Sequence, residues 1–302
     1  MRVVLVGKGQ MLCSLIEGCL ACGGVEIVGV LRYDNLISHP VRVWFDKFFK
    51  TSYENTLIRK YRLRDLSFNS VNSREFRSFL LTQNVDLMLV GTWREKISEE
   101  TYNIPKLASV NVHPSLLPKY RGPNPYLQVI KNQEKYSGFS FHLIAQGFDT
   151  GAILYQKKVE ILPYYTSKEL RDRIVFEVKH SIPEFLVALD KGAIIPLEQN
   201  EAVATYFSNI DENEKMLDFS CSSADEIIAK VKALHPWLPA YIVVGEDFYI
   251  ANPYQMSIIS GCEDDINLFE KRIIKLCADG RCVVFNGVEK YHSSLKFHPY
   301  KG

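Results

Sequence analysis

The amino-terminal part of the chain alternates two almost entirely apolar runs with one amphipathic segment. Arg2–Gly7 and Val25–Leu31 have the length and composition of buried strands, and Met11–Cys22 between them repeats apolar residues at helical spacing. A buried strand, a helix and a second buried strand in succession are typical of a parallel α/β sheet with helices on its faces. The pattern therefore predicts a doubly wound, Rossmann-like, mostly parallel sheet.

After about residue 198 the sequence pattern changes to that of short strands separated by turns. We therefore predict an α/β domain over residues 1–198 and a small antiparallel, OB-like barrel over residues 199–302. The predicted later helices are Ser73–Leu81, Pro125–Lys131, Ser167–Asp190 and Ser223–Leu234. The predicted later strands are Val85–Val90, one that ends at His113, Ser137–Ile144, Ile153–Val159, Tyr241–Val244, Phe248–Ile250, Arg272–Leu276 and Arg281–Phe285.

The first strand ends in a Gly-x-Gly sequence, Gly7 to Gly9, which resembles the start of a dinucleotide-binding loop. The third glycine of that fingerprint is replaced by Leu12, and no acidic residue closes the second strand. Both are needed for the pyrophosphate and the ribose. We therefore do not expect NAD binding.

Composition excludes several classes of protein. The 302 residues carry a formal net charge of +1, so a nucleic-acid partner would need a local basic patch. The seven cysteines offer no second Cys-x-x-Cys after Cys19 and Cys22, so reduced thiols and no metal site are expected. No charged-then-apolar leader opens the chain, and no apolar run reaches about 18 residues. We expect a cytoplasmic protein without a membrane partner.

Two loops carry polar side chains of catalytic types beside apolar strands. Asn111 and His113 stand at the exit of a predicted strand, where alternation puts both side chains on one face. Asp149 stands in a turn between Gly147 and Gly151, where the backbone can approach a ligand closely. An amide, an imidazole and a carboxylate are suited to moving an acyl group. The structural alternatives are a common Asn-x-His pair and a turn-capping aspartate.

These residues resemble the catalytic core of the formyltransferases that use 10-formyltetrahydrofolate, the family of the methionyl-tRNA, glycinamide ribonucleotide and sugar-amine formyltransferases. The shared motifs, in order, are Asn-x-His at 111–113, Ser-Leu-Leu-Pro at 115–118, Arg121-Gly122 and Asp-Thr-Gly at 149–151. The resemblance is close over residues 85–159 and looser elsewhere. It implies that Asn111, His113 and Asp149 are catalytic, with a formyl-folate cosubstrate and no metal.

Formyl transfer to an amine passes through a tetrahedral centre that carries an oxyanion. We expect an N–H of Asn111 to donate to that oxygen, and removing such a donor typically costs roughly 3 to 4 kcal/mol. His113 is either a proton acceptor when neutral or a second donor when protonated, and the sequence leaves both open. Asp149 is expected to hold the imidazole or a water and to raise the pKa of His113. His142 is interpreted as a packed, hydrogen-bonded core histidine.

By the resemblance, the pterin of the folate binds at the end of the apolar run 85–91, opposite the segment just before Asp149. The predicted folate-binding residues are Met88, Leu89, Val90, Gly91, Arg94, Ser115, Leu116, Leu117, Pro118, Ile144, Ala145, Gln146 and Gly147. The charged residues at 94–96 depart from the uncharged loop that is usual in the family. Arg94 is therefore assigned either to the glutamate tail of the folate or to a solvated charge run.

The sequence leaves two kinds of acceptor amine open. Ala204-Thr-Tyr206 and the helix leading to residues 235–241 resemble the second domain of methionyl-tRNA and amino-sugar formyltransferases, which the glycinamide ribonucleotide branch lacks. The chain length suits a free-standing enzyme that acts on initiator methionyl-tRNA. A UDP- or dTDP-linked amino sugar is the alternative. A non-catalytic folate- or RNA-binding homologue is disfavoured because all three catalytic residues are present.

Residues 34–68 interleave aromatic and basic side chains. They are either an electrostatic clamp for the phosphates of a tRNA or a sugar nucleotide, or a solvated amphipathic helix. The glycine- and lysine-rich loop that methionyl-tRNA formyltransferases carry in this region is not recognisable here. The sequence does not fix the oligomeric state.

Overall fold

The structure is a computed structural model that describes residues 1–32, 52–211 and 213–291. Two compact units divide the chain: the first holds residues 1–121, 138–159 and 173–206, and the second holds 122–137, 160–172 and the described residues from 207 onward. The predicted domain boundary between residues 198 and 199 stays a prediction. About half of the predicted basic and aromatic region, residues 34–51, lies outside the described residues.

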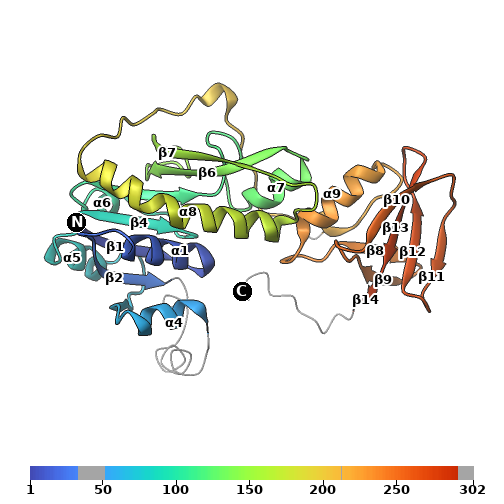
Figure 1. Ribbon diagram of the computed structural model, residues 1–302, viewed down its shortest axis with the longest axis horizontal. Coiled ribbons are helices and arrows are strands. Elements are labelled where there is room, and N and C mark those ends of the chain that lie inside the picture. The colour runs from blue at the N-terminus through green and yellow to red at the C-terminus, as the bar shows by residue number, and fades with distance from the viewer. Residues whose placement is uncertain (33–51, 212, 292–302) are drawn as a thin grey trace. The chain divides into compact units, whose positions relative to one another are not determined.

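The first unit is built on a seven-stranded sheet with the strand order β3-β2-β1-β4-β5-β6-β7 (Figure 1). Neighbouring strands from β3 to β5 run parallel, and β6 runs antiparallel to β5. The predicted α/β fold with a large, mostly parallel sheet is therefore confirmed. The strands are β1 (Arg2–Gly7), β2 (Glu26–Arg32), β3 (Asp65–Leu66), β4 (Leu87–Gly91), β5 (Ala108–His113), β6 (Tyr136–Leu143) and β7 (Ile153–Glu160).

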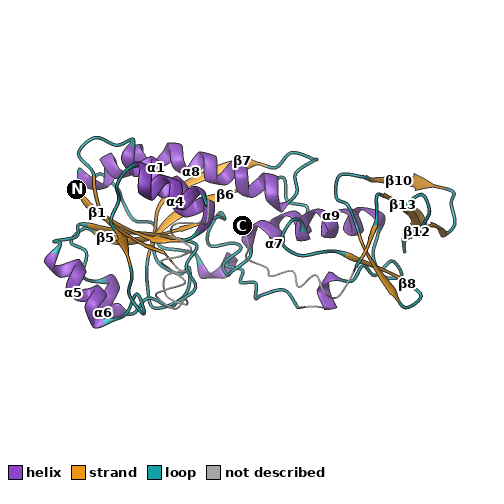
Figure 2. Cartoon of the chain, turned by 90° about the horizontal axis from the view of Figure 1, so that it is seen from below, coloured by secondary structure: helices purple, strands orange, loops and turns teal. Residues whose placement is uncertain are grey.

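Helices cover both faces of this sheet, with α1, α4 and α8 on one side and α5 and α6 on the other (Figure 2). Their bounds are α1 (Gly9–Leu20), α4 (Tyr53–Lys60), α5 (Arg74–Thr82), α6 (Glu99–Tyr102) and α8 (Ser167–Asp190). α1 packs closely on α8, because a Cβ at Gly18 would lie 2.7 Å from the Cβ of Ile182. α5 begins at a serine cap, where the Ser73 side chain accepts a hydrogen bond from the backbone N–H of Phe76.

The central strands are buried on both faces, as their continuous apolar sequence predicts. Val3, Leu5, Leu87 and Leu89 are fully buried, and burying each such side chain contributes about 1.5–3 kcal/mol. Met88 and Val90 of β4 point into the cluster that α5 completes. This rigid core holds the carboxyl ends of β4 and β5 side by side, with Val90 next to Asn111.

In the loop from β1 to α1, contacts within the protein account for Gly7 and for the N–H of Gly9. A Cβ at Gly7 would lie 2.1 Å from the carbonyl oxygen of Gly91, so the end of β1 needs a glycine. The N–H of Gly9 at the beginning of α1 donates to the carboxylate of Glu54 from α4. That helix end is where a dinucleotide phosphate would bind. A phosphate there would meet a carboxylate of the protein itself.

The second unit contains two antiparallel sheets with the orders β10-β13-β12-β11 and β14-β9-β8. Among the described residues these sheets are not joined into one closed barrel, so the predicted antiparallel character is confirmed and the barrel is not. The helices are α7 (Pro125–Lys131) and α9 (Ala224–Leu234), and short 3-10 turns occupy Glu201–Val203 and Asn213–Lys215. The strands are β8 (Tyr241–Val244), β9 (Asp247–Ile250), β10 (Met256–Ser260), β11 (Asp265–Asn267), β12 (Arg272–Leu276), β13 (Arg281–Asn286) and β14 (Glu289–Lys290).

The cysteines correct one expectation. Cys262 and Cys282 form a disulfide bond, although the sequence was interpreted as having only reduced thiols. The strand register brings them together, since Ile259 of β10 pairs with Cys282 of β13 and Cys262 follows β10. A sequence separation of 20 residues gives no sign of this pairing. The other five cysteines are free thiols. Within the described ranges, no helix is long and apolar enough to span a membrane.

Candidate active site

The polar residues predicted to be catalytic meet at the carboxyl end of β5. Asn111 and His113 lie on one face of this strand, two residues apart, and Asp149 lies in the turn that follows β6. Nδ1 of His113 is 3.4 Å from Oδ1 of Asp149. Nδ2 of Asn111 is also 3.4 Å from that oxygen. The structure therefore brings the carboxylate of Asp149 to an amide that lies 38 residues before it and to the neighbouring imidazole.

The ring of His113 is held by the loop that follows it. Its Nε2 lies 2.8 Å from the carbonyl oxygen of Tyr120, which can only accept a hydrogen bond. Nε2 therefore carries a proton, and in the neutral ring Nδ1 is the unprotonated nitrogen. That nitrogen faces Asp149. The His113 side chain is 5% exposed and the Asp149 side chain 13% exposed, so the group is deeply set but reached by solvent at the carboxylate.

Burial decides the charge of His113. It lowers the pKa of His113 below the usual 6.5, while the nearby Asp149 carboxylate and the hydrogen bond to Tyr120 act in the opposite direction. The raising influence of Asp149 on the pKa of His113, which the sequence predicted, is therefore present without being the largest. The carboxylate has the predicted influence, but the loss of hydration around the ring outweighs it. A neutral imidazole is the form favoured at neutral pH.

His142 belongs to this group, and the sequence analysis did not include it among the site residues. It lies opposite Asn111 in the antiparallel pairing of β5 and β6. Its Nδ1 donates to the carbonyl oxygen of Leu143 at 2.8 Å, and its Nε2 lies 3.0 Å from Nδ2 of Asn111. The predicted packed, hydrogen-bonded histidine is observed, since His142 is 2% exposed. The same bonds orient the carboxamide of Asn111, which only the strand register could have revealed.

The predicted folate-binding residues fall into three sets. Met88, Leu89 and Val90 are buried in the core of the sheet, on alternating faces, Gly91 at the strand end is buried as well, and Arg94 is exposed. Ile144 to Gly147 run from the end of β6 towards Asp149 and become exposed along the way. The backbone at these two strand ends therefore lies beside the catalytic group.

The third set, Ser115 to Pro118, forms a loop that is held by bonds within the loop and from β6 and β7. The Ser115 hydroxyl donates to the carbonyl oxygen of Lys119 at 2.7 Å, and the Ser140 hydroxyl donates to the carbonyl oxygen of Ser115 at 2.7 Å. The carbonyl oxygen of Leu117 accepts a hydrogen bond of 3.0 Å from the Gln156 side chain. These bonds fix the loop that carries Tyr120. The loop therefore holds the carbonyl of Tyr120 that bonds to His113.

Arg121, the cation of the Arg-Gly motif, binds other side chains of the protein. Its side chain is 7% exposed and binds the carboxylate of Glu201 through two nitrogens, at 2.9 and 2.6 Å. The side-chain oxygen of Gln199 accepts two further bonds from the same guanidinium. The sequence analysis missed Gln199 and Glu201, because neither lies near the motifs along the chain.

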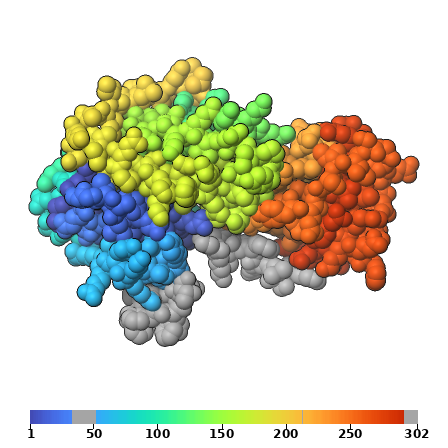
Figure 3. All heavy atoms as spheres, in the orientation of Figure 1, coloured from blue at the N-terminus to red at the C-terminus, as the bar shows by residue number. Residues whose placement is uncertain are grey.

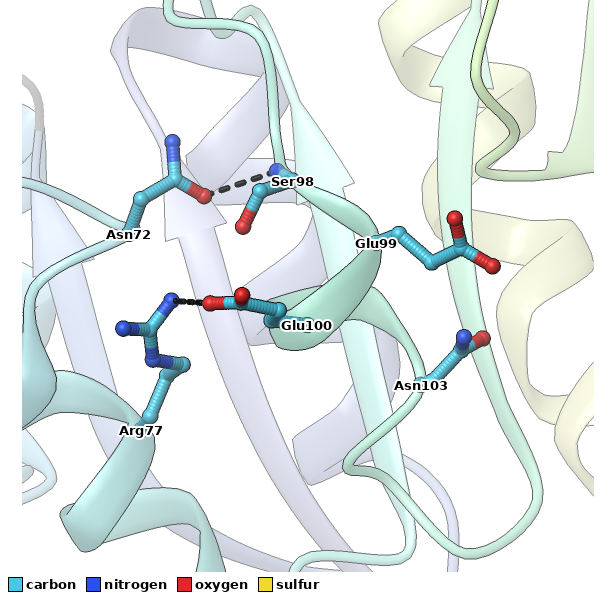
Figure 4. Close-up of a pocket in the computed structure, with 6 residues that line it drawn as sticks. All are labelled: Asn72, Arg77, Ser98, Glu99, Glu100 and Asn103. Carbon is cyan, nitrogen blue, oxygen red and sulfur yellow. Dashed lines mark hydrogen bonds and ion pairs between the residues drawn. The ribbon is translucent and has the colours of Figure 1, made fainter.

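A separate surface hollow lies between α5 and α6 (Figure 4). It has a volume of about 620 Å³ and contains an ion pair between Arg77 and Glu100, and a hydrogen bond from the N–H of Ser98 to Asn72. None of its lining residues is a predicted site residue. Among the residues that the structure describes, no group of three or more metal-binding side chains could hold a metal ion.

Known proteins that are similar to this chain are formyltransferases. Residues 1–186 match the formyl transferase family. The methionyl-tRNA formyltransferase of Thermotoga maritima is 29% identical over 233 residues, which is 77% of this chain and 72% of the relative. That of Nitrosomonas europaea is 32% identical over 224 residues, 74% of this chain and 67% of the relative.

A crystal structure of an N-formyltransferase from Helicobacter canadensis, in complex with folinic acid and dTDP-3-aminofucose, has a similar fold. The TM-score is 0.69 at 18% identity, and the match covers 96% of this chain and 100% of the other. The chain thus shares its fold with a group-transfer enzyme. The chain belongs to the formyl transferase family. It is an enzyme that transfers formyl groups, as the sequence predicted.

Proposed function

We propose that this enzyme formylates the methionyl amine of initiator methionyl-tRNA. The formyl donor is 10-formyltetrahydrofolate, the cosubstrate of its family. The observation that carries the proposal is the identity to methionyl-tRNA formyltransferases, which is 29% over 77% of this chain for the Thermotoga maritima enzyme. The solved amino-sugar enzyme is only 18% identical.

In the proposed mechanism Asn111 stabilises the oxyanion. One N–H of its carboxamide is held by His142 at 3.0 Å, and the other makes a long contact of 3.4 Å with Asp149. The formyl oxygen can replace the long contact, so the bond strengthens as negative charge develops on that oxygen. Such a donor typically lowers the barrier by about 3 to 4 kcal/mol.

His113 is proposed to move the proton. The methionyl nitrogen attacks the formyl carbon, and the N–H proton that it must lose passes to Nδ1 of His113, because Nε2 already donates to Tyr120. The C–N bond to the folate then breaks, and the same proton passes to the departing folate nitrogen. Asp149 stabilises the imidazolium in between, at 3.4 Å from Nδ1.

Four exposed basic residues support an RNA acceptor: Arg59, Lys60, Arg62 and Arg64. They follow one another at the end of α4 and in the turn to β3. Basic side chains grouped on a surface bind phosphates and release counterions. The buried Arg121 is unsuited to this task, since Glu201 occupies its guanidinium.

An amino-sugar nucleotide is the second candidate acceptor, favoured by the fold match to the Helicobacter canadensis enzyme over 96% of this chain. The deciding experiment supplies 10-formyltetrahydrofolate with charged initiator tRNA in one reaction and with dTDP- or UDP-linked amino sugars in others. Release of tetrahydrofolate only with the tRNA supports the proposal. Release only with a sugar nucleotide refutes it.

The finer assignments are part of the same proposal. The pterin binds between the backbone at Gly91 and the segment from Ile144 to Gly147, and the glutamate tail extends towards Arg94. Residues 1–198 form the catalytic domain, and residues 199–302 form an OB-like module that contacts the acceptor. The enzyme works in the cytoplasm, where its folate and tRNA substrates occur. The support for the pterin position is the pairing of β4 and β6 with β5, which sets the strand ends at Gly91 and Ile144 beside Asn111.

A further inference from the structure

A segment after α8 ties the two loops of the site together. We call residues 197–206 the strap; the segment lies at the surface of the first unit, in gold at the top of the view (Figure 3). At its start, Leu197 exchanges two backbone hydrogen bonds of 2.8 Å with Ile153, just after the Asp149 turn. At its end, the carbonyl oxygen of Thr205 accepts the N–H of Arg121 at 2.9 Å. The strap therefore contacts both the Asp149 turn and the loop that holds His113.

Gln199 joins these two ends through one side chain. Its Nε2 donates to the carbonyl oxygens of Asp149, at 2.8 Å, and Gly151, at 2.7 Å. Its Oε1 accepts from Nε and Nη2 of Arg121, at 3.1 and 2.7 Å. The amide thus uses both its donors and both its acceptor positions. Its orientation is fixed, because a flipped amide would face two carbonyl oxygens with its oxygen and a guanidinium with its NH2.

Both connected loops contain a residue in a strained backbone conformation. Asp149 has a φ of 56° and Tyr120 a φ of 61°, which is the left-handed region. Such residues persist only where surrounding bonds hold them, and they cluster at functional sites. Gln199 binds the carbonyl of Asp149, and the Thr205 hydroxyl accepts the N–H of Tyr120 at 2.8 Å. The strap thus holds the two backbone positions from which the carboxylate and the partner of His113 are presented.

We propose that Gln199 is a positioning residue for formyl transfer, which sets the carboxylate of Asp149 against the ring of His113 through the two carbonyls and Arg121. The inference rests on the proposed function. Gln199 is half-buried. Within the site, its side chain bonds to the backbone carbonyls of the Asp149 turn and to none of the three catalytic side chains. Its effect is therefore geometric.

The position of Asp149 is measurable through His113. The groups that face this ring are Asp149, which raises its pKa, and His142 and Arg121, which lower it, besides the carbonyl of Tyr120. If the Asp149 turn loosens, the raising influence weakens and the pKa of His113 falls further. A proton acceptor with a lower pKa keeps its activity to lower pH, so the acid limb of the pH profile moves down.

Two substitutions distinguish the bonds that Gln199 makes to the two carbonyls from those that it makes to Arg121. Gln199→Glu keeps an acceptor for Arg121 but has no N–H for the two carbonyls, and Gln199→Met removes all four bonds at similar size. Glu198→Gln, at the adjacent exposed position, is the matched control. We expect both Gln199 variants to lose about 100-fold in kcat, as misplacement by about an ångström typically costs. KM for the folate should change little. The control should behave as the wild type.

The readouts are kcat, KM and their pH profiles, normalised to the folded fraction from circular dichroism, with the NMR titration of His113 in the ligand-free protein. A lower kcat in both variants, with a lower His113 pKa in Gln199→Met, supports the positioning role. Unchanged kcat and an unchanged His113 titration overturn it, as does a loss confined to KM. A wild type that transfers no formyl group to any acceptor refutes the proposed function, while the titration still decides the role of Gln199.

Discussion

Asp149→Asn is the sharpest test of the catalytic group, because it removes one charge and leaves the turn intact. Asparagine is similar in size to aspartate and tolerates the left-handed backbone that residue 149 adopts, with φ 56°. Opposite charges 3.4 Å apart attract by about 5 kcal/mol at an effective dielectric constant of about 20. The Asp149 side chain is 13% exposed, and screening by solvent reduces the attraction to about 4 kcal/mol of imidazolium stabilisation. At 1.36 kcal/mol per decade, kcat should fall about 1,000-fold.

The assay follows release of tetrahydrofolate from 10-formyltetrahydrofolate with saturating charged initiator tRNA. The NMR titration of His113 in the same variant should show a lower pKa than in the wild type, since the influence that opposes burial is gone. Thermal melts at pH 7.5 control for folding. A kcat close to that of the wild type would mean that Asp149 does not stabilise charge on His113, and the mechanism would have to be abandoned.

The remaining predictions concern the same site and its acceptor. Asn111→Ala should lower kcat by roughly 100- to 1,000-fold with little change in KM, and a change in KM alone would contradict the oxyanion role. His142→Leu should lower kcat less than this, since His142 only orients the carboxamide; steady-state rates for both variants decide the order. The low pKa of His113 means that the unfolded chain binds a proton more readily below about pH 6.5 than the folded one does; stability from this group should therefore fall as pH drops below that value, and melts of His113→Gln should lose that part of the slope. Exchanging Arg62 and Arg64 for glutamate should raise KM for charged tRNA and make it less dependent on salt, while leaving KM for the folate unchanged in parallel titrations.

The sequence predicted the scaffold well, because its signals are local. The strand that ends at His113 and the long helix Ser167–Asp190 have the predicted bounds, since a continuous apolar run and a 3.6-residue repeat are read directly from neighbouring residues. Alternation also placed Asn111 and His113 on one face. Of the second unit, the strands at Tyr241–Val244 and Arg272–Leu276 were predicted, whereas β10 and β11 were missed because many of their side chains are exposed.

The features of the site that could not be predicted from the sequence depend on the register of the strands and on contacts between distant residues. His142 orients Asn111 only because β5 and β6 pair in one register. Gln199 lies 50 residues from the carbonyl that it binds, and no local pattern marks it. The pKa of His113 depends on how completely the ring is buried, which outweighs a carboxylate at 3.4 Å. The sequence shows the carboxylate but not the burial.

The contact between Glu54 and the beginning of α1 also bears on how this protein responds to its ionic surroundings. A helix amino terminus attracts inorganic anions, which often stabilise proteins by binding there. In this chain α1 carries its own counterion, because the buried carboxylate of Glu54 accepts the N–H of Gly9. We therefore expect sulfate or phosphate in the buffer not to bind at that end of the helix, because the Glu54 carboxylate already occupies it.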